Sequence, residues 1–324
     1  MLGEGAVMEI ARQDDLWLLA PDVACLPGPI VNVYLVGRPG VGDRGWTLID
    51  AGMVGMTEQI ARAAAARFGA AARPAAIVLT HGHVDHVSAL EELAERWDAP
   101  IYAHPRELPY LTGRSTYPPP DPTVGGGLMS RLSVLFPRGP LDLGARVQAL
   151  PDDGGVPNLP DWRALPTPGH APGHVSFFRE ADRLLIAGDA FVTTKQESFV
   201  AALLKPISIQ GPPTYFTPDW DAARRSVEAL AALHPASAGT GHGRPLAGVR
   251  LDEALGRLAR NFDHLAVPKQ GRYVSQPAVA DERGVVSVPP PPLDVRGTRY
   301  GGIASALLAA ILLTALRRRL GKSR

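Results

Sequence analysis

The stretch Ile77-Val-Leu-Thr-His-Gly-His-Val-Asp-His86 carries three histidines and one aspartate within six residues, directly after an apolar run. The apolar run, which ends at Thr80, is typical of a buried β-strand, and the polar residues that follow it would lie on a strand-to-helix turn. A metal ion needs several lone pairs that converge within about 2.0–2.2 Å of one point, and a short rigid turn supplies them without ordering separate loops. The stretch therefore predicts a metal-binding turn.

The spacing within the turn divides its residues into two pairs. His81 and His83 alternate, so both can face one ion, whereas Asp85 and His86 lie further round the turn and can face a second. Because buried polar groups need partners, a polar turn satisfied by hydrogen bonds alone is the weaker interpretation.

Length and composition indicate a globular protein with room for one large domain or two small ones. The chain has 324 residues, of which 45% are apolar and 20% charged. Its formal net charge is +1, but the last eight residues contribute +5, so residues 1–316 carry −4. A protein that binds the phosphate backbone normally has a basic face, so we expect a small-molecule substrate and no nucleic-acid partner.

Cys25, the single cysteine, excludes an internal disulfide and a thiolate metal cluster. Any metal site must therefore use histidine and carboxylate ligands. The N-terminal residues 1–17 include acidic residues and contain no apolar run followed by a small-residue cleavage site. With no secretory signal evident, we expect a cytoplasmic location.

Short β-like runs and amphipathic helical stretches alternate in both halves of the chain. Strands are expected at residues 16–19, 31–36, 46–50, 76–80, 101–104, 146–150, 174–179 and 183–187. Helices are expected at residues 57–68, 88–97, 220–233 and 249–265. We interpret residues 109–127 as a surface loop and residues 195–220 as a candidate lid. The mixed elements predict two related αβ halves packed sheet to sheet.

The sequence changes character after Val267. The composition of residues 267–300 predicts a Pro-rich linker, and that of residues 301–324 predicts an apolar helix with a basic tail. The apolar part, about 16 residues, would span roughly 24 Å as a helix, short of the ~30 Å hydrocarbon core. Three alternatives stay open: a shallow helix attached to a membrane surface, a membrane span, and a helix that packs in solution or in a dimer.

The turn and four further elements resemble the metallo-β-lactamase-fold hydrolases, whose hallmark is His-x-His-x-Asp-His. The resemblance covers residues 10–265, and the order and approximate spacing of the elements agree with the family. The four further elements are Leu48-Ile49-Asp50-Ala51-Gly52, Thr167-Pro168-Gly169-His170, Gly188-Asp189 and Gly241-His242. The resemblance implies an α/β fold, a four-layer αββα sandwich, in a catalytic domain over residues 1–266, to which the apolar C-terminal helix is added.

The resemblance also implies a dinuclear metal site. The first ion would be held by His81, His83 and His170, the second by Asp85, His86 and His242, and Asp189 would bridge the two. Seven nitrogen and oxygen donors without sulfur suit two Zn²⁺ per chain, with Fe or Mn as alternatives.

Other residues near these motifs are expected to support the site rather than to bind metal. Asp50 would form a hydrogen bond near the turn, and His174 would support the ligands or pack structurally. Many true β-lactamases of the family have a Cys in the place of Asp189, so its absence argues against antibiotic hydrolysis. The chain is more similar to the hydroxyacylglutathione hydrolase and lactonase-like branch.

We therefore expect a metal-dependent hydrolase that uses a metal-bridging hydroxide to cleave a small ester, thioester or lactone. Asp85 is the candidate catalytic residue, because it can orient the nucleophile and then return its proton to the leaving group. Within the candidate lid, Tyr215 could donate to a leaving oxygen and Lys205 could meet a carboxylate, so both are candidate substrate-binding residues.

Three other hypotheses compete with this one. A mononuclear iron persulfide dioxygenase would use a subset of the same ligands, and the complete second set argues against it. A phosphodiesterase or nuclease of the same fold is disfavoured by the acidic body of the chain. A non-catalytic module attached to a membrane is disfavoured by the intact ligand set.

Overall fold

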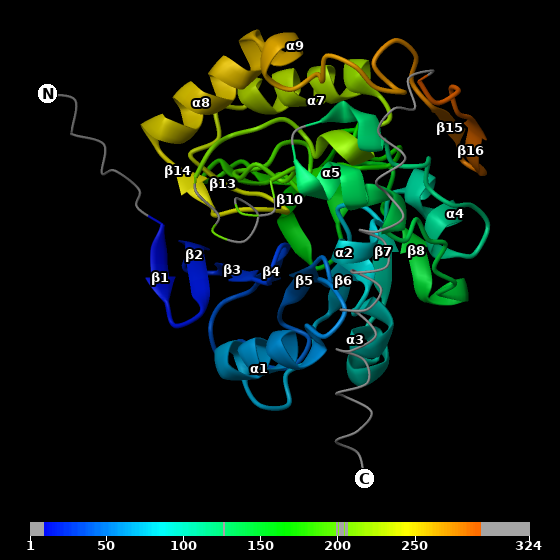
Figure 1. Cartoon of the computed structure of the whole chain (residues 1–324). Coiled ribbons are helices and arrows are strands. Elements are labelled where there is room, and N and C mark those ends of the chain that lie inside the picture. Colours follow the sequence, from blue (N-terminus) through cyan, green and yellow to red (C-terminus); the bar gives the residue numbers. More distant parts are fainter. Residues whose placement is uncertain (1–9, 126, 199, 201–203, 205–206, 293–324) are drawn as a thin grey trace, which may run out of the picture.

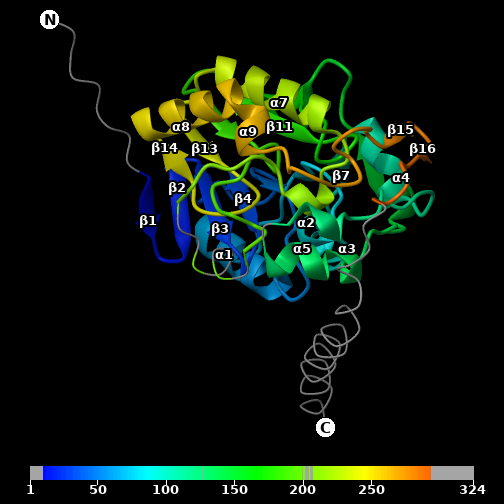
Figure 2. The ribbon, with the colours of Figure 1, turned by 45° about the horizontal axis from the view of Figure 1, so that its top comes forward.

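The computed structural model describes residues 10–125, 127–198, 200, 204 and 207–292, which form two β-sheets between two layers of helices (Figure 1). Helices α1 (Thr57–Phe68) and α3 (Leu90–Trp97) cover one sheet, and α7 (Trp220–Ala232) and α8 (Val249–Arg260) cover the other. Figure 2 shows the upper helical layer from a second side, continued by α9 (Phe262–Leu265). The αββα order predicted from the sequence is confirmed.

The first sheet has eight strands in the order in which they occur along the chain. They are β1 (Ala11–Gln13), β2 (Leu16–Ala20), β3 (Val23–Pro27), β4 (Asn32–Val36), β5 (Thr47–Ile49), β6 (Ala76–Val78), β7 (Ile101–Ala103) and β8 (Val147–Ala149). Pairing is antiparallel from β1 to β5 and parallel from β5 to β8. Parallel pairing needs crossover connections, and α1 and α3 supply two of them.

The second sheet has six strands in the order β14-β13-β12-β11-β10-β9. They are β9 (Gly155–Val156), β10 (Leu159–Pro166), β11 (Val175–Arg179), β12 (Leu184–Ile186), β13 (Ser237–Gly239) and β14 (Leu246–Ala247). Only the β12–β13 pair is parallel among these strands, and α7 lies in its crossover. The carboxyl ends of β12 and β13 therefore lie side by side.

Three apolar cores hold the layers together. One lies between the first sheet and its helices, where the Trp46 ring stacks on Phe68 with centroids 4.6 Å apart. The second lies between the sheets and joins residues such as Tyr34 and Phe177, and the third lies beneath α7 and α8. Because both faces of the central strands are covered, the strands read as apolar runs without polar alternation.

Short helices complete the described chain. They are α2 (Val84–Val87), α4 (Leu108–Leu111), α5 (Leu128–Leu132) and the 3-10 helices η1 (Pro105–Glu107), η2 (Pro122–Val124), η3 (Ser133–Leu135), η4 (Gly144–Arg146) and η5 (Thr214–Phe216).

Residues 109–127 are not the surface loop that their Pro- and Gly-rich composition predicts. Tyr110 and Tyr117 are buried, and their rings stack with centroids 4.0 Å apart. Asp121 is buried as well, and its carboxylate accepts hydrogen bonds from the backbone of Thr123 and of Arg272. Tertiary contacts thus bury a segment whose local composition predicts exposure.

The described part of residues 267–300 also differs from the extended linker that the sequence predicts. Residues 268–288, here called the strap, contain the hairpin β15 (Val279–Asp281) and β16 (Gly284–Ser287) and pack against residues 109–127. The Tyr273 side chain is buried and donates a hydrogen bond to the carbonyl of Pro119. These contacts involve residues about 150 positions apart, which sequence periodicity does not detect.

Within the part of the chain that the structure describes, none of the helices has the length and apolar character needed to cross a membrane. The apolar helix and basic tail expected at residues 301–324, with their membrane contact, lie outside the described residues.

Candidate metal centre

The histidine-rich turn lies at the carboxyl end of β6, as the sequence predicts. Its chain leaves the strand after Val78 and enters α2 with His83 at the N-cap position. His81, His83 and His86 are buried, whereas the side chain of Asp85 is 24% exposed. The turn thus carries three buried ligand candidates and one that reaches toward solvent.

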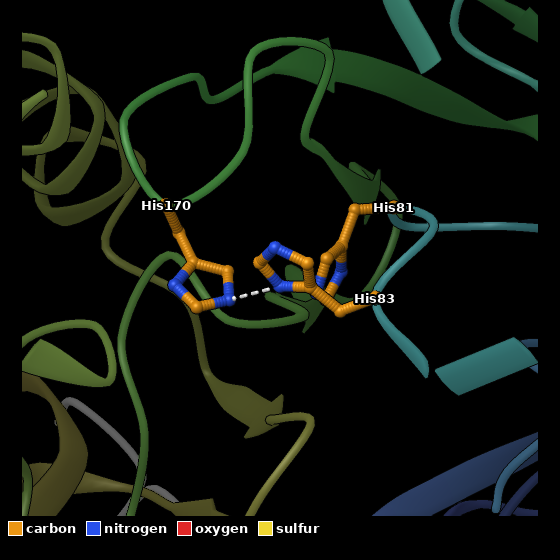
Figure 3. Close-up of side chains that lie close together, drawn as sticks. All are labelled: His81, His83 and His170. Atoms are coloured by element: carbon orange, nitrogen blue, oxygen red, sulfur yellow. Dashed lines mark hydrogen bonds between the residues drawn. The ribbon is translucent and has the colours of Figure 1, made fainter. Parts of the chain in front are cut away.

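The seven residues expected as ligands form three overlapping groups. In each group the nitrogen and oxygen atoms lie within 4.8 Å of one another, and the groups are His81, His83 and His170; His81, His86 and Asp189; and Asp85, His86 and His242. Figure 3 shows His81, His83 and His170 turned toward one another, with Nδ1 of His83 and Nε2 of His170 2.9 Å apart. The structure therefore brings together all seven candidates.

Asp189 lies between the groups. Its Oδ2 is 3.0 Å from Nε2 of His242 and 3.4 Å from Nε2 of His170, and its Oδ1 is 3.6 Å from Nε2 of His86. On the far side, Asp85 lies 3.4 Å from the same nitrogen of His242. This is the position that a bridging carboxylate would occupy.

Strand ends from both sheets position the ligand candidates. His170 follows β10, Asp189 follows β12 and His242 follows β13. The turns around them need glycine: at Gly169 φ is +133°, and a Cβ there would lie 2.4 Å from the backbone nitrogen of Ala223. The Thr-Pro-Gly-His and Gly-Asp elements of the sequence are thus tight turns at strand ends.

Hydrogen bonds outside the centre orient the histidines. Nδ1 of His86 lies 2.9 Å from the carboxylate of Asp50, and Nδ1 of His242 lies 2.6 Å from the carbonyl of Ile30. A carboxylate or a carbonyl only accepts, so each Nδ1 carries the proton and each Nε2 presents its lone pair to the centre. Asp50 thus has the supporting role that the sequence predicts.

His174 supports the centre in a different way. Its Nε2 accepts a hydrogen bond of 2.9 Å from the backbone nitrogen of Asp189. Its Nδ1 then carries the proton and donates to the hydroxyl of Thr167, 2.8 Å away. His174 therefore links the loop that bears His170 to the loop that bears Asp189.

The donor atoms of the centre fit a metal ion. Nε2 of His81, Nε2 of His86 and Oδ1 of Asp189 are buried and have no hydrogen-bond partner among the described residues. An unpartnered buried lone pair is costly, and three that face one another are explained by a cation between them. The donor set is nitrogen and oxygen without sulfur, which suits zinc, iron or manganese.

The pKa values of three buried histidines and of Asp189 favour the charge states that metal ligands need, whereas at His86 and His242 burial acts to lower the pKa but the charge of Asp189 raises it. Burial, reinforced by the neighbouring histidines, lowers the pKa of His81 and of His170 well below the ordinary value, and burial lowers the pKa of His83 to about 4. Burial would raise the pKa of Asp189, but His242 and His86 hold that pKa well below its usual range. Neutral imidazoles and an ionised carboxylate are the forms that bind metal.

Of the two candidate substrate-binding residues, Tyr215 lies near the centre. It is buried, and burial followed by the charge of Asp85 raises the pKa of its hydroxyl well above the ordinary value. Lys205 lies outside the described residues.

Aromatic residues cover the side of the centre at His83: Phe216 of the candidate lid, and Tyr117 and Tyr273, which the sequence analysis missed. The rings of Tyr117 and Phe216 lie 4.4 Å and 5.0 Å from the His83 ring, measured between centroids. With Tyr273 of the strap they line a cavity of about 10 Å³ beside His83 and His170. No local signal marks the two tyrosines, because Tyr117 lies in a Pro-rich segment and Tyr273 in a segment expected to be a linker.

Comparison with known proteins agrees with this geometry. Residues 26–242 match the family described as the metallo-beta-lactamase superfamily. "Probable metallo-hydrolase YflN" of Bacillus subtilis (strain 168) is 45% identical over 236 residues, which are 73% of this chain and 89% of that protein. "Uncharacterized protein YobT" of the same organism is 30% identical over 73% of this chain and 92% of its own.

A solved structure shows the same fold. The metallo-beta-lactamase family protein TTHA1429 from Thermus thermophilus is 23% identical and superposes with a TM-score of 0.51, over 76% of this chain and 80% of that chain.

Replacing Asp50 by asparagine should weaken metal binding about 10- to 100-fold, because the partner that orients His86 loses its charge and one acceptor oxygen. Asn tolerates the left-handed backbone at this position, where φ is +60°, so the backbone is not strained further. Competition against a chromogenic chelator measures the affinity. Asp43→Asn, at an exposed carboxylate that pairs with Arg73, serves as the control and should leave the affinity unchanged. Unaltered affinity in Asp50→Asn would contradict the role assigned to Asp50.

Proposed function

The chain belongs to the metallo-beta-lactamase superfamily, and from this premise we propose that it is a metal-dependent hydrolase of a small ester, thioester or lactone. The observation that carries the proposal is the convergence of seven buried or half-buried ligand candidates whose inner donor atoms lack hydrogen-bond partners among the described residues. The name of the relative from Bacillus subtilis, a probable metallo-hydrolase, supports the same reaction class.

The proposed ligand set divides between two ions. The first would be held by His81, His83 and His170, the second by Asp85, His86 and His242, with Asp189 between them. Two Zn²⁺ are our first choice, and Fe or Mn suits the same donors. When bound, such ions make water acidic enough to ionise near neutral pH and polarise the bond under attack.

Asp85 is the proposed general base and acid. Its carboxylate is the most exposed of the seven ligand candidates, so it can reach both the attacking water and the leaving group of a bound substrate. It would hold the proton taken from water and pass that proton to the leaving oxygen or sulfur. Because Asp85 is also a ligand candidate, its loss would affect both metal content and turnover.

Tyr215 is the proposed donor to a substrate oxygen. A tyrosine hydroxyl is protonated at neutral pH, and the raised pKa here reinforces that state, so Tyr215 can donate a hydrogen bond to a substrate oxygen that gains negative charge. A contact between Lys205 and a substrate carboxylate stays a prediction.

The space for the rest of the substrate is a cavity of about 290 Å³ that adjoins the small cavity beside His83, because Pro118 and Pro218 line both. Its walls also include Arg106 and Arg225, for which the described residues provide no ion-pair partner, and Asp219, whose carboxylate caps α7. The cavity wall thus has two guanidinium groups and one carboxylate, and that carboxylate is already hydrogen-bonded to the backbone of α7. This balance of charge favours a substrate with an anionic group, such as a carboxylate or a phosphate.

Protein purified without chelator should contain two metal ions per chain, and elemental analysis measures this number directly. Removal of the ions should lower the midpoint of thermal unfolding, because the ions bind the folded chain and not the unfolded one. Zinc should restore the midpoint. One iron per chain would contradict the two-ion site and would favour the persulfide dioxygenase hypothesis instead.

Asp85→Asn should reduce kcat by about 10²- to 10⁴-fold on whichever substrate the protein hydrolyses, because general acid–base catalysis is lost. Panels of esters, thioesters and lactones identify the substrate, with phosphodiesters and β-lactams as classes that we expect to be inert. Metal content is measured on the same sample. Asp161→Asn, at an exposed position on β10, is the matched control. If protein with two bound ions hydrolyses none of these compounds, the hydrolase proposal is wrong.

Arg225→Gln should raise KM for an ester with an anionic acyl group about three- to tenfold and should leave KM for a neutral ester with the same leaving group unchanged. Arg224→Gln is the control, since the Arg224 guanidinium already lies 3.1 Å from the carboxylate of Asp221. Equal effects of Arg225→Gln on both esters would exclude the proposed charge recognition.

A further inference from the structure

Glu107 is a buried carboxylate that the proposed reaction does not use. It ends η1, shortly after β7, and its side chain is fully buried. No ion pair involves it within the described residues, so its charge is balanced by hydrogen-bond donors alone. Burial raises its pKa to about 7, although the donors around it act in the opposite direction.

The donors to Glu107 come from the two loops that carry the first group of ligand candidates. Oε2 accepts a hydrogen bond of 2.9 Å from the backbone nitrogen of Gly82, which lies between His81 and His83. Oε1 accepts one of 2.7 Å from the backbone nitrogen of Gly173, three residues after His170. One carboxylate therefore joins the two loops whose histidines meet beside it.

The close fit of the two loops to Glu107 shows in their glycines. A Cβ at Gly173 would lie 2.9 Å from Cγ of Glu107, and a Cβ at Gly82 would lie 2.7 Å from the Tyr117 hydroxyl. A larger residue at Gly173 would push that peptide away from Glu107, and a larger residue at Gly82 would collide with Tyr117. Glycine at both positions therefore allows the close packing of this cluster.

Tyr117 completes the cluster. Its hydroxyl donates to the Glu107 carboxylate, and its ring packs against the ring of His83. Glu107 thus reaches His83 by two routes, through the Gly82 peptide and through the Tyr117 ring.

We propose that Glu107 is a positioning residue for the metal centre: its carboxylate fixes the Gly82 and Gly173 peptides and so sets His81 and His83 at the correct distance from His170. The inference rests on the metal-binding part of the proposed function and not on hydrolysis. It assigns Glu107 to the first ion, because its contacts reach neither Asp85 nor His242.

Glu107→Gln tests this assignment. Glutamine keeps the shape but offers one acceptor oxygen, and its amide NH₂ faces the second peptide N–H, so one of the two links is broken. Titration of the metal-free protein with Co²⁺ and with Zn²⁺ against a chromogenic chelator should show about 10- to 100-fold weaker binding of one ion and unchanged binding of the other. The absorption of the bound Co²⁺ should change for that ion alone.

Asp121→Asn is the matched control. Asp121 is also buried and accepts backbone hydrogen bonds, but these come from Thr123 and Arg272, outside the ligand loops. The Asp121→Asn variant should unfold at a lower temperature than the wild type and should bind both metal ions with unchanged affinity. If the affinities fall in both variants in proportion to stability, Glu107 has only a structural role and the proposal is overturned.

Tyr117→Phe keeps the ring on His83 but removes the hydroxyl, which donates to Glu107 and accepts a hydrogen bond of 3.0 Å from the backbone nitrogen of Gly82, while both peptide bonds to Glu107 remain. It should weaken binding of the first ion by a smaller factor than Glu107→Gln does, and a loss equal to that of Glu107→Gln would overturn the proposal.

If Glu107→Gln does not fold without metal, Glu107→Asp takes its place, because the shorter side chain cannot reach both peptides. Wild-type protein that binds two ions but hydrolyses nothing would refute the hydrolase and leave this test intact.

Discussion

The structure depends on one electrostatic constraint: buried imidazole and carboxylate lone pairs must meet a positive charge. His81, His86 and Asp189 are each at most 1% exposed, and each points a donor atom at the others without a hydrogen bond among the described residues. In an apolar interior this arrangement costs several kcal/mol per group unless a cation lies between them. The fold imposes this arrangement because strands of both sheets end at the same place. The residues after β6 of one sheet and after β10, β12 and β13 of the other therefore meet at a single point.

Hydrogen bonds around the centre fix the orientation of His86 and His242 and the position of the Asp189 backbone. Asp50 and the carbonyl of Ile30 hold two imidazole protons away from the centre, and His174 holds the backbone of Asp189. Glu107 acts on peptides instead of on side chains. The four supporting groups come from four parts of the chain, so the loss of any of their contacts would alter the centre without removing a ligand, which is how outer residues tune metal sites.

The sequence predicts the centre better than its surroundings, for a physical reason. The turn from His81 to His86 follows an apolar strand and gives a local signal, whereas His170, Asp189 and His242 are predicted by the resemblance of their glycine-containing turns to the family. The alternating strands and helices predict two αβ halves packed sheet to sheet, and the resemblance implies the αββα order. Glu107 gives no such signal, because its partners lie 25 and 66 positions away. The Pro-rich composition of residues 109–127 and 268–288 predicts exposure, whereas Tyr117 and Tyr273 are buried by contacts between these two segments and the centre.

The residues at the strand ends and the segments that cover them have different proposed roles, the first in the reaction and the second in contacts with the substrate. The strand ends hold the groups that would activate water, and the fold that brings them together is that of the superfamily. The cover over His83 comes instead from Tyr117, from Phe216 and from Tyr273 in the strap, and the strap also forms a wall of the larger cavity that contains Arg106 and Arg225. Residues 109–127 and the strap pack on the sandwich without adding strands to either large sheet, and the β15–β16 hairpin of the strap is a separate two-stranded sheet. The strap contributes no ligand candidate, so among the described residues its part is to line the cavities, whereas Tyr117 also contacts His83 and Glu107 and is therefore tied to the metal centre.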